Sequence, residues 1–221
     1  TRIAEEIYFH ALSQSVDLAE QYGAHPAFKE TRLARGELHP TLFAQAALDS
    51  PRWQALRARI RETGVRNALL IAIAPTATIA SIAGCFECIE PMVSNLFKRE
   101  TLSGDFLQVN RHLVGELKRL GLWTPTLVDA LKRAEGSIQG MTEIPEALRS
   151  IYRTAWELPQ RALIDLAATR AAYIDQSQSL NLFQANPNIG VLSSMYMHAW
   201  RSGLKTTYYL RSRPASRIAQ A

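Results

Sequence analysis

Apolar residues that recur every three or four positions predict a helix at the start of the chain. They are Ile3, Ile7, Ala11, Leu18 and Tyr22. Gly23 then provides a helix stop, and residues 24–40, which contain two prolines and a glycine, predict a loop. A second helix is predicted with Ser50 as its N-cap, Pro51 at its first position and Gly64 as its stop.

Helical periodicity also dominates the second half of the chain. It predicts helices over 106–121, 125–136, 145–174 with a break near Pro159, and within 186–203. Residues 136–144 are expected to be irregular. Residues 92–106 are expected to be extended and then to turn at "LSGD", residues 102–105.

Three segments have the pattern of strands. Residues 68–74 form a continuous apolar run, as expected of a strand buried on both faces, and 177–183 and 204–210 follow near the end of the chain. Strands separated by helices predict a parallel α/β sheet or barrel. Three strands make a thin sheet for a complete α/β domain. Residues 211–221 are expected to be a frayed tail.

Composition is that of a soluble globular protein, with 221 residues of which 47% are hydrophobic and 20% charged. The longest apolar run, 68–74, is too short to cross a bilayer, and the start of the chain has no signal-peptide pattern. The net charge of +5 permits nucleic-acid binding. Its basic residues are interspersed with acids along helices, however, which favours solvated helix faces. Because the sequence begins without methionine, we expect a piece of a longer chain.

The apolar run 68–74 leads into "PTATIASIAG", residues 75–84, which has small side chains, free backbone N–H groups and two hydroxyls, Thr76 and Thr78. In parallel α/β folds such loops hold small anions at the ends of strands. The alternative is a turn of small residues that packs closely under a helix. The loop lacks the lysine of a P-loop and the glycines of a dinucleotide-binding motif.

Two further features carry candidate chemistry. Cys85 and Cys88 form a C-x-x-C motif, which is found in redox pairs and in halves of zinc sites. Without a second such motif, and with scattered histidines, zinc is not favoured, and two cysteines suit a reducing cytosol. The neighbours Tyr208 and Tyr209 lie in a predicted strand, where alternate side chains would point to opposite faces and pack.

Four blocks in order, "LLIAIAPTATIASIAG", "IEPMVSNLFKRETLSGDFLQVN", "IDQSQSLNLF" and "GLKTTYYLRSRPA", resemble the carboxyl-terminal part of the large, catalytic subunit of class I ribonucleotide reductase. The stretch "HALSQSVDLAEQYGAHPAFKETRLARGEL" is also similar to this family. The resemblance covers essentially the whole chain. It implies the helix-rich carboxyl-terminal part of a ten-stranded α/β barrel, with about three strands present.

On this resemblance the chain is one domain, 1–221, the carboxyl-terminal part of the barrel. Its expected parts are a helical lead-in (1–67), a strand with a phosphate loop (68–100), a helical region (101–176) and a last strand-helix-strand unit with a tail (177–221). Glu90-Pro91 matches the family's "IEP" and is expected to shape the chain after the phosphate loop.

The resemblance also implies site residues. Thr76, Ala77, Thr78 and Ile79 would bind the diphosphate of a ribonucleoside diphosphate through backbone amides and the threonine hydroxyls. At Ile79 many relatives have serine or threonine, so a side-chain hydrogen bond is lost there while the backbone donor remains. Tyr208 and Tyr209 would stack as catalytic residues and pass an oxidising equivalent from the small subunit's radical to a cysteine.

The implied reaction is the reduction of ribonucleoside diphosphates to deoxyribonucleoside diphosphates in the cytoplasm. The implied partners are the substrate, the small radical-generating subunit, a second copy of the full-length large subunit, and thioredoxin or glutaredoxin as reductant. This chain would hold no metal or cofactor, because the family's metal-radical cofactor is in the small subunit.

The family's radical cysteine and its reducing cysteine pairs have no counterpart in this sequence. The 221 residues are therefore expected to be inactive alone, with Cys85 and Cys88 as structural thiols and a redox role as the alternative. A non-catalytic anion-binding or subunit-assembly module remains the competing function. A longer natural chain that contains the radical cysteine would separate the two. A basic nucleic-acid binder is a third possibility, which steep salt dependence of DNA binding would support.

Overall fold

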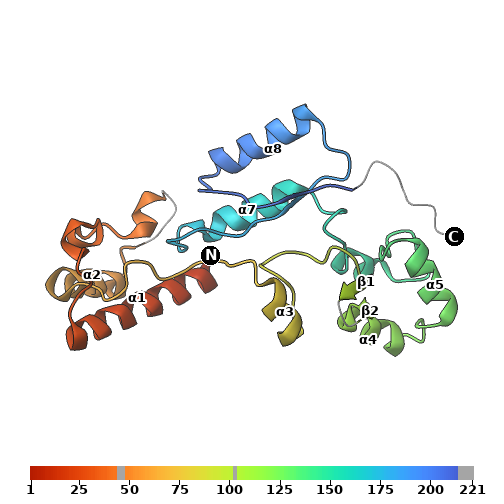
Figure 1. The fold of residues 1–221 in the computed structure, drawn as a ribbon, viewed down its shortest axis with the longest axis horizontal. Coiled ribbons are helices and arrows are strands. Elements are labelled where there is room, and N and C mark those ends of the chain that lie inside the picture. Colours follow the sequence, from red (N-terminus) through yellow and green to blue (C-terminus); the bar gives the residue numbers. More distant parts are fainter. Residues whose placement is uncertain (44–47, 102–103, 214–221) are drawn as a thin grey trace.

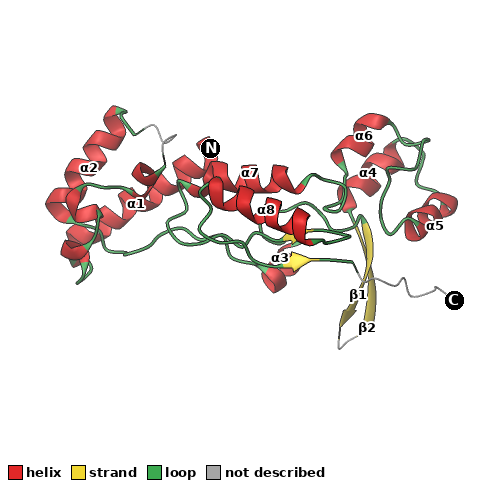
Figure 2. Cartoon of the chain, turned by 90° about the horizontal axis from the view of Figure 1, so that it is seen from above, coloured by secondary structure: helices red, strands yellow, loops and turns green. Residues whose placement is uncertain are grey.

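The computed structural model of the chain describes residues 1–43, 48–101 and 104–213. The elements of these residues form an elongated molecule with groups at its two ends and a third group between them (Figure 1). Each group has its own cluster of buried apolar side chains. The parallel strands and the loop that follows residue 74 belong to the middle of the molecule (Figure 2).

The N-terminal group contains the two helices predicted for it. They are α1 (Arg2–Tyr22) and α2 (Pro51–Thr63), and each ends before a glycine with positive φ, 79° at Gly23 and 87° at Gly64. That conformation suits glycine because it has no Cβ. The predicted loop between the helices contains short 3₁₀ turns at Phe28–Glu30, Leu33–Arg35 and His39–Leu42.

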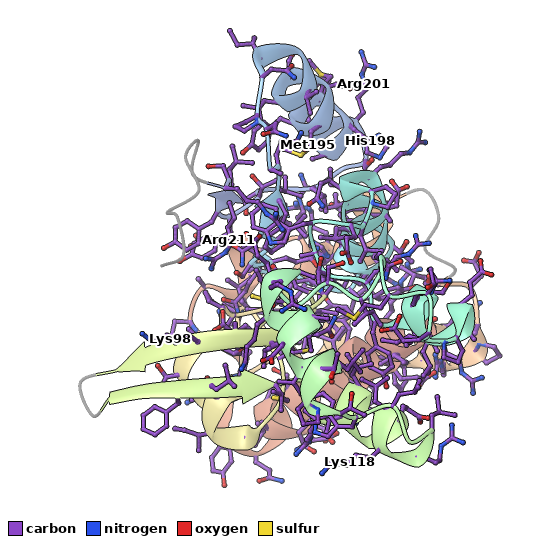
Figure 3. The ribbon with its side chains drawn as sticks, turned by 90° about the vertical axis from the view of Figure 1, so that its right-hand side faces the viewer. Lys98, Lys118, Met195, His198, Arg201 and Arg211 are labelled. Atoms are coloured by element: carbon purple, nitrogen blue, oxygen red, sulfur yellow. The ribbon has the colours of Figure 1, made fainter. Side chains whose placement is uncertain are left out.

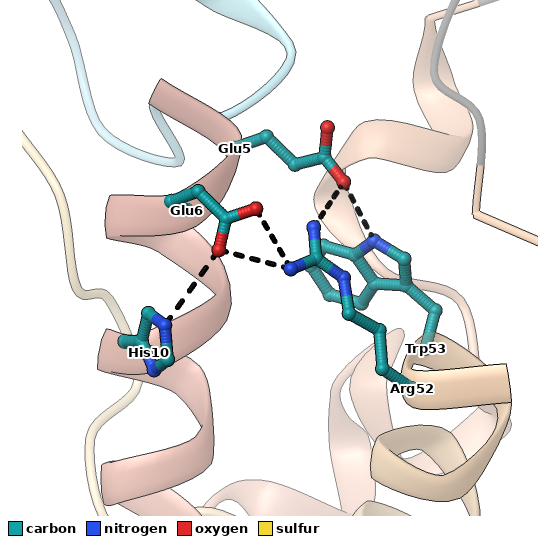
Figure 4. Close-up of polar contacts among 5 residues, drawn as sticks. All are labelled: Glu5, Glu6, His10, Arg52 and Trp53. Atoms are coloured by element: carbon teal, nitrogen blue, oxygen red, sulfur yellow. Dashed lines mark hydrogen bonds and ion pairs between the residues drawn. The ribbon is translucent and has the colours of Figure 1, made fainter. Parts of the chain in front are cut away.

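A buried tryptophan joins α1 to α2. Trp53 is 0% exposed, and its indole N–H donates to the Glu5 carboxylate at 3.1 Å. Arg52 donates to Glu5 at 2.7 Å and to Glu6 at 2.7 Å and 2.9 Å (Figure 4). Burial raises the pKa of Glu5, but the hydrogen bonds from Trp53 and Arg52 outweigh it and hold that pKa below its ordinary value. The two helices are therefore fixed by polar as well as apolar contacts.

The group at the opposite end combines a hairpin with three short helices. Strands β1 (Leu96–Thr101) and β2 (Gly104–Val109) pair antiparallel. They are followed by α4 (Arg111–Arg119), α5 (Pro125–Arg133) and α6 (Glu146–Ile151). The extended segment predicted over 92–106 is thus confirmed for β1, while residues 102 and 103 of the predicted turn lie outside the described residues.

The helix predicted over 106–121 is wrong at its start. Residues 106–109 belong to β2, where they pair with residues 96–99. The helix begins only after Asn110, whose side-chain oxygen accepts the N–H groups of His112 and Leu113 at 3.1 Å and 3.3 Å. An asparagine cap of this kind satisfies N–H groups that have no partner within a helix. Pairing with the preceding strand of the hairpin therefore overrides the local helical pattern.

Two longer helices cover the middle group. They are α7 (Gln160–Ala171) and α8 (Ile189–Arg201). The predicted break near Pro159 is confirmed, because α6 ends at Ile151 and Pro159 directly precedes α7. On α8, Met195 is buried and His198 Nε2 lies 2.6 Å from Asp165 of α7 (Figure 3). Among the residues that the structure describes, no helix is both long and apolar enough to span a membrane.

The three predicted strand segments lie side by side in one parallel arrangement. The central segment is 177–183. On one of its edges, the Ile73 N–H donates to Ser177 O at 3.1 Å, and the Ile73 carbonyl accepts the N–H of Ser179 at 2.8 Å. On the other edge, β3 (Leu182–Phe183) pairs parallel with β4 (Leu210–Arg211). The central segment 177–183 therefore lies between 71–73 and 208–211. This arrangement confirms the expected parallel α/β organisation.

Two details of the predicted strands are wrong. Residues 68–74 form no continuous strand and are not buried on both faces, since Leu69 is 56% exposed and the pairing is a single bridge at Ile73. Within the described residues this segment is hydrogen-bonded to a neighbouring segment along one edge alone. A strand buried on both faces instead lies inside a sheet whose two faces are covered by other elements. The expected tail begins later than predicted, because Arg211 is in β4, and residues 214–221 lie outside the described residues.

Candidate functional site

The predicted phosphate loop forms the start of a short helix. Thr76 has a left-handed backbone (φ 54°, ψ 20°) and precedes α3 (Ala77–Ala83). The first hydrogen bond of this helix runs from the Ala80 N–H to the Thr76 carbonyl at 2.8 Å. The N–H groups of Ala77, Thr78 and Ile79 consequently have no partner within the helix. These three residues are exposed, so their N–H groups are donors available to an anion.

Cys88, which follows α3 by five residues, contacts this loop. Its N–H donates to Thr76 Oγ1 at 3.1 Å, and its thiol contacts the Pro75 carbonyl oxygen at 3.4 Å and the Ser179 hydroxyl at 3.3 Å. Burial raises the pKa of the Cys88 thiol, which therefore stays protonated. Cys85 is exposed, and both thiols are free. The contacts of Cys88 support a structural role.

Asp175 and Lys205 fix the segment that leads into the loop. The Asp175 carboxylate accepts the N–H groups of Leu70 and Ile71 at 2.9 Å and 2.8 Å. The Lys205 ammonium donates to carbonyl oxygens of the turn that contains Asp175, those of residues 174, 175 and 176, at 3.1 Å, 2.7 Å and 2.7 Å. Sequence reasoning missed both residues, because a single Asp after a helix and a single Lys before a strand carry no motif.

The two tyrosines of the predicted relay contact one another directly. Their ring centroids are 4.0 Å apart with the planes at 47°, and their hydroxyls are 3.2 Å apart. Tyr208 is 45% exposed and Tyr209 55% exposed. The hydrogen bond to Tyr209 raises the pKa of Tyr208. The phenols are therefore paired and accessible.

An extra residue in the strand explains why neighbouring side chains lie together. The Tyr208 N–H donates to Leu180 O, and the Leu182 N–H donates to Tyr209 O, both at 2.9 Å. In a regular parallel ladder one residue would make both bonds; here two consecutive residues share them, which is a β-bulge. The bulge breaks the alternation of side chains, so the rings contact each other in a tilted pair instead of pointing to opposite faces.

Glu90 and Asn181 connect the tyrosine strand to the chain that follows the loop. The Glu90 carboxylate accepts the Asn181 backbone N–H at 2.7 Å and its side-chain N–H at 3.0 Å. The Asn181 side-chain oxygen accepts the Tyr209 N–H at 3.2 Å. Asn181 is only 3% exposed. The family resemblance implied a shaping role for Glu90-Pro91, and the sequence gave no sign of the role of Asn181.

Strand register places the loop and the tyrosine pair at the same level. Ile73 is level with Gln178, and Tyr208 bonds to Leu180, so Pro75, two residues beyond Ile73, is level with Tyr208. The loop and the pair are thus separated by two strand spacings, about 10 Å. The structure therefore brings the two predicted sites together, on either side of the central segment.

Comparison with known proteins identifies a family and named relatives for this chain. The family described as "Ribonucleotide reductase, barrel domain" matches residues 1–210. The chain is 46% identical over 215 residues to the "Ribonucleoside-diphosphate reductase large subunit" of Arabidopsis thaliana, covering 97% of this chain and 26% of that protein. It is 42% identical over 221 residues to the protein of the same name from Danio rerio, covering 100% of this chain and 28% of that protein.

A solved structure shows the same fold. The "Actinobacillus ureae class Id ribonucleotide reductase alpha subunit" superposes with a TM-score of 0.62 at 23% sequence identity, over 86% of this chain and 38% of that one. The expected fold, a helix-rich part of an α/β barrel, is confirmed. The chain spans only about a quarter of the length of the curated relatives quoted above, 26% and 28%.

Proposed function

Since this chain belongs to the ribonucleotide reductase barrel-domain family, we propose that it supplies the diphosphate-binding loop and the tyrosine relay of a ribonucleoside-diphosphate reductase large subunit. That subunit would reduce ribonucleoside diphosphates to deoxyribonucleoside diphosphates by radical chemistry in the cytoplasm. Because the chain spans about a quarter of its relatives, the reaction belongs to the whole subunit and not to these residues alone.

The substrate end of the proposal rests on the donors at the start of α3. The free N–H groups of Ala77, Thr78 and Ile79 face no competing intrahelical acceptor. The Thr78 hydroxyl adds a donor. The Thr76 hydroxyl oxygen accepts the Cys88 N–H, so the Thr76 hydroxyl proton remains available to donate to a ligand. A diphosphate accepts hydrogen bonds from all of these groups. Hydrogen bonds to a charged group are among the stronger ones in proteins.

The observation that carries the function is the direct contact of Tyr208 and Tyr209, with hydroxyls 3.2 Å apart. When one phenol has lost an electron and a proton, the other can give up both, so that the radical moves while the number of electrons and protons in the pair stays constant. The hydrogen bond supplies the path for the proton, and the contacting rings supply the path for the electron. A phenylalanine has no phenol to oxidise.

Partners follow from this role. We propose that the oxidising equivalent comes from the metal-radical cofactor of a small subunit, which takes up the electron and proton, and that it ends on a cysteine thiol of the large subunit. Among the described residues, no group of three or more His, Cys, Asp or Glu side chains could hold a metal ion. A second copy of the large subunit, and thioredoxin or glutaredoxin as reductant, complete the proposed system.

The test uses the full-length large subunit together with its small subunit. Tyr208→Phe and Tyr209→Phe should each abolish nucleotide reduction, while substrate binding and thermal stability stay nearly unchanged. Tyr22→Phe is the matched control, because Tyr22 is exposed on α1 outside the site, and it should keep full turnover. The isolated 221-residue chain should be inactive in every form.

Substantial turnover by either Tyr208→Phe or Tyr209→Phe would show that the rings only pack. If the diphosphate still bound in that case, the non-catalytic anion-binding function would be favoured. Loss of turnover in Tyr22→Phe as well would point to a general folding defect.

A further inference from the structure

The β-bulge at the tyrosine pair leaves one backbone group outside the strand ladder. Tyr208 uses its N–H, and Tyr209 uses its carbonyl, to bond the central segment. The N–H of Tyr209 therefore has no ladder acceptor. The side-chain oxygen of Asn181 accepts it at 3.2 Å. A backbone N–H without a partner is costly away from water, so this bond stabilises the bulged conformation against a regular strand.

Glu90 fixes the orientation of the Asn181 amide. Its carboxylate accepts both the backbone N–H and the side-chain N–H of Asn181, at 2.7 Å and 3.0 Å. Because a carboxylate only accepts, the amide nitrogen must face Glu90 and the amide oxygen must face Tyr209. Asn181 is 3% exposed, so water does not compete for these bonds.

The Glu90–Asn181 contact is also close in sequence to the proposed diphosphate-binding loop. Glu90 lies two residues after Cys88, whose N–H holds Thr76 and whose thiol contacts Ser179 of the central segment. Glu90 and Asn181 thus tie the chain that follows the loop to the strand that carries the tyrosines.

We propose that Glu90 and Asn181 are positioning residues that hold the rings of Tyr208 and Tyr209 in their close, tilted contact. This inference rests on the relay proposed above. The two residues act through the backbone N–H of Tyr209 and through the bulge. Displacing the phenols by about 1 Å would interrupt transfer even though both rings remain, since errors of that size in reacting groups cost of the order of 100-fold in rate.

The experiment measures kcat, KM and thermal stability of the full-length large subunit with its small subunit. In Asn181→Leu the acceptor for the Tyr209 N–H is lost, and kcat should fall roughly 10- to 100-fold while KM for the ribonucleoside diphosphate stays within about twofold. Glu90→Gln places an amide donor against the Asn181 donor, and Asn181→Asp places two carboxylates together. Both single variants should lower kcat.

The double variant Glu90→Gln/Asn181→Asp provides a reciprocal rescue. Its amide donor comes from position 90 and its carboxylate from position 181, so that all three hydrogen bonds and the net charge are restored. It should recover most of the lost kcat. A residue needed only for general stability would not show a rescue of kcat that depends on this match.

Gln160→Leu is the matched structural control. The Gln160 side-chain oxygen accepts the N–H of Phe183 at 2.7 Å, on the same central segment but away from the bulge. Its loss should lower thermal stability and leave kcat unchanged. Equal falls of kcat in Gln160→Leu and Asn181→Leu would overturn the positioning role, as would a normal kcat in Asn181→Leu or a failure of the double variant to recover.

If Asn181→Leu does not fold, the comparison of Glu90→Gln with the double variant decides the question. The relay is tested separately. If Tyr208→Phe or Tyr209→Phe turns over, the relay and the positioning role both fail. If both are inactive while Asn181→Leu keeps its kcat, only the positioning role fails.

Discussion

The segment that leads into the proposed diphosphate-binding loop depends on the carboxylate of Asp175. Both oxygens are used, one by the N–H of Leu70 at 2.9 Å and the other by the N–H of Ile71 at 2.8 Å. We expect Asp175→Asn to loosen this attachment. Asparagine keeps one acceptor, but its NH₂ group then faces the second N–H, and the charge is removed.

The size of the effect follows from these two bonds. A hydrogen bond to a charged group contributes about 1.5–3 kcal/mol, and the site is partly buried, so Asp175→Asn should cost about 2 kcal/mol of the free energy of unfolding. For a cooperative unit of this size that corresponds to a fall in Tm of about 4–8 °C. Asp175→Ala, which loses both bonds, should be worse. The KM for substrate should also rise, because residue 71 lies only four residues before Pro75.

Differential scanning calorimetry of the full-length subunit, with steady-state kinetics beside it, measures both effects. Asp129→Asn is the matched control, because Asp129 is exposed and pairs with Lys132 one helical turn away, at 3.2 Å. Exposed pairs of this kind contribute about 0–1 kcal/mol. If Asp175→Asn lowered Tm no more than Asp129→Asn, the two backbone bonds would not stabilise the segment and the reasoning would be refuted.

Three further predictions concern single side chains. In Thr78→Val the KM for ribonucleoside diphosphates should rise roughly 10- to 100-fold through loss of one hydrogen bond to a charged group, and an unaltered KM would exclude this hydroxyl from the site. The double variant Cys85→Ala/Cys88→Ser should keep most of the activity with a dithiol reductant, because the serine hydroxyl can replace the hydrogen bonds of the Cys88 thiol. Loss of activity in a folded double variant would contradict the structural role. Burial lowers the pKa of His39, so the unfolded chain binds a proton before the folded one, and stability should fall as the pH drops below about 6.5; His39→Gln should reduce this dependence in melts from pH 7 to 5, and an unchanged dependence would contradict the assignment.

Helices were the elements that local sequence determined best. The stops at Gly23 and Gly64, the start at Pro51 and the break before α7 were all predicted correctly. Each depends on residues within one or two turns: a glycine that tolerates positive φ, or a proline that cannot continue a helix. Periodicity and caps are local properties, and so they can be read without the fold.

Strands were determined less well because each depends on pairing with another segment of the chain. Residues 106–109 continue the apolar pattern of the helix that follows, yet pairing with 96–99 makes them a strand. Residues 68–74 have the composition of a doubly buried strand, yet in the structure they pair along one edge and are largely exposed. Which segments pair, and on which edges, is a property of the whole chain.

The candidate site divides in the same way. The sequence by itself determined the family, through four blocks in order, and it pointed to Thr76–Ile79 and to the pair Tyr208 and Tyr209. It gave no means of seeing that Asn181 and Glu90, 91 residues apart in sequence, meet in one hydrogen-bonded pair. Strand alternation even predicts that the tyrosine rings diverge. The resemblance implied contact between the rings, but only the tertiary structure shows how they meet: strand register puts an extra residue into the ladder, and the Asn181 side chain accepts the Tyr209 N–H that has no acceptor in the ladder.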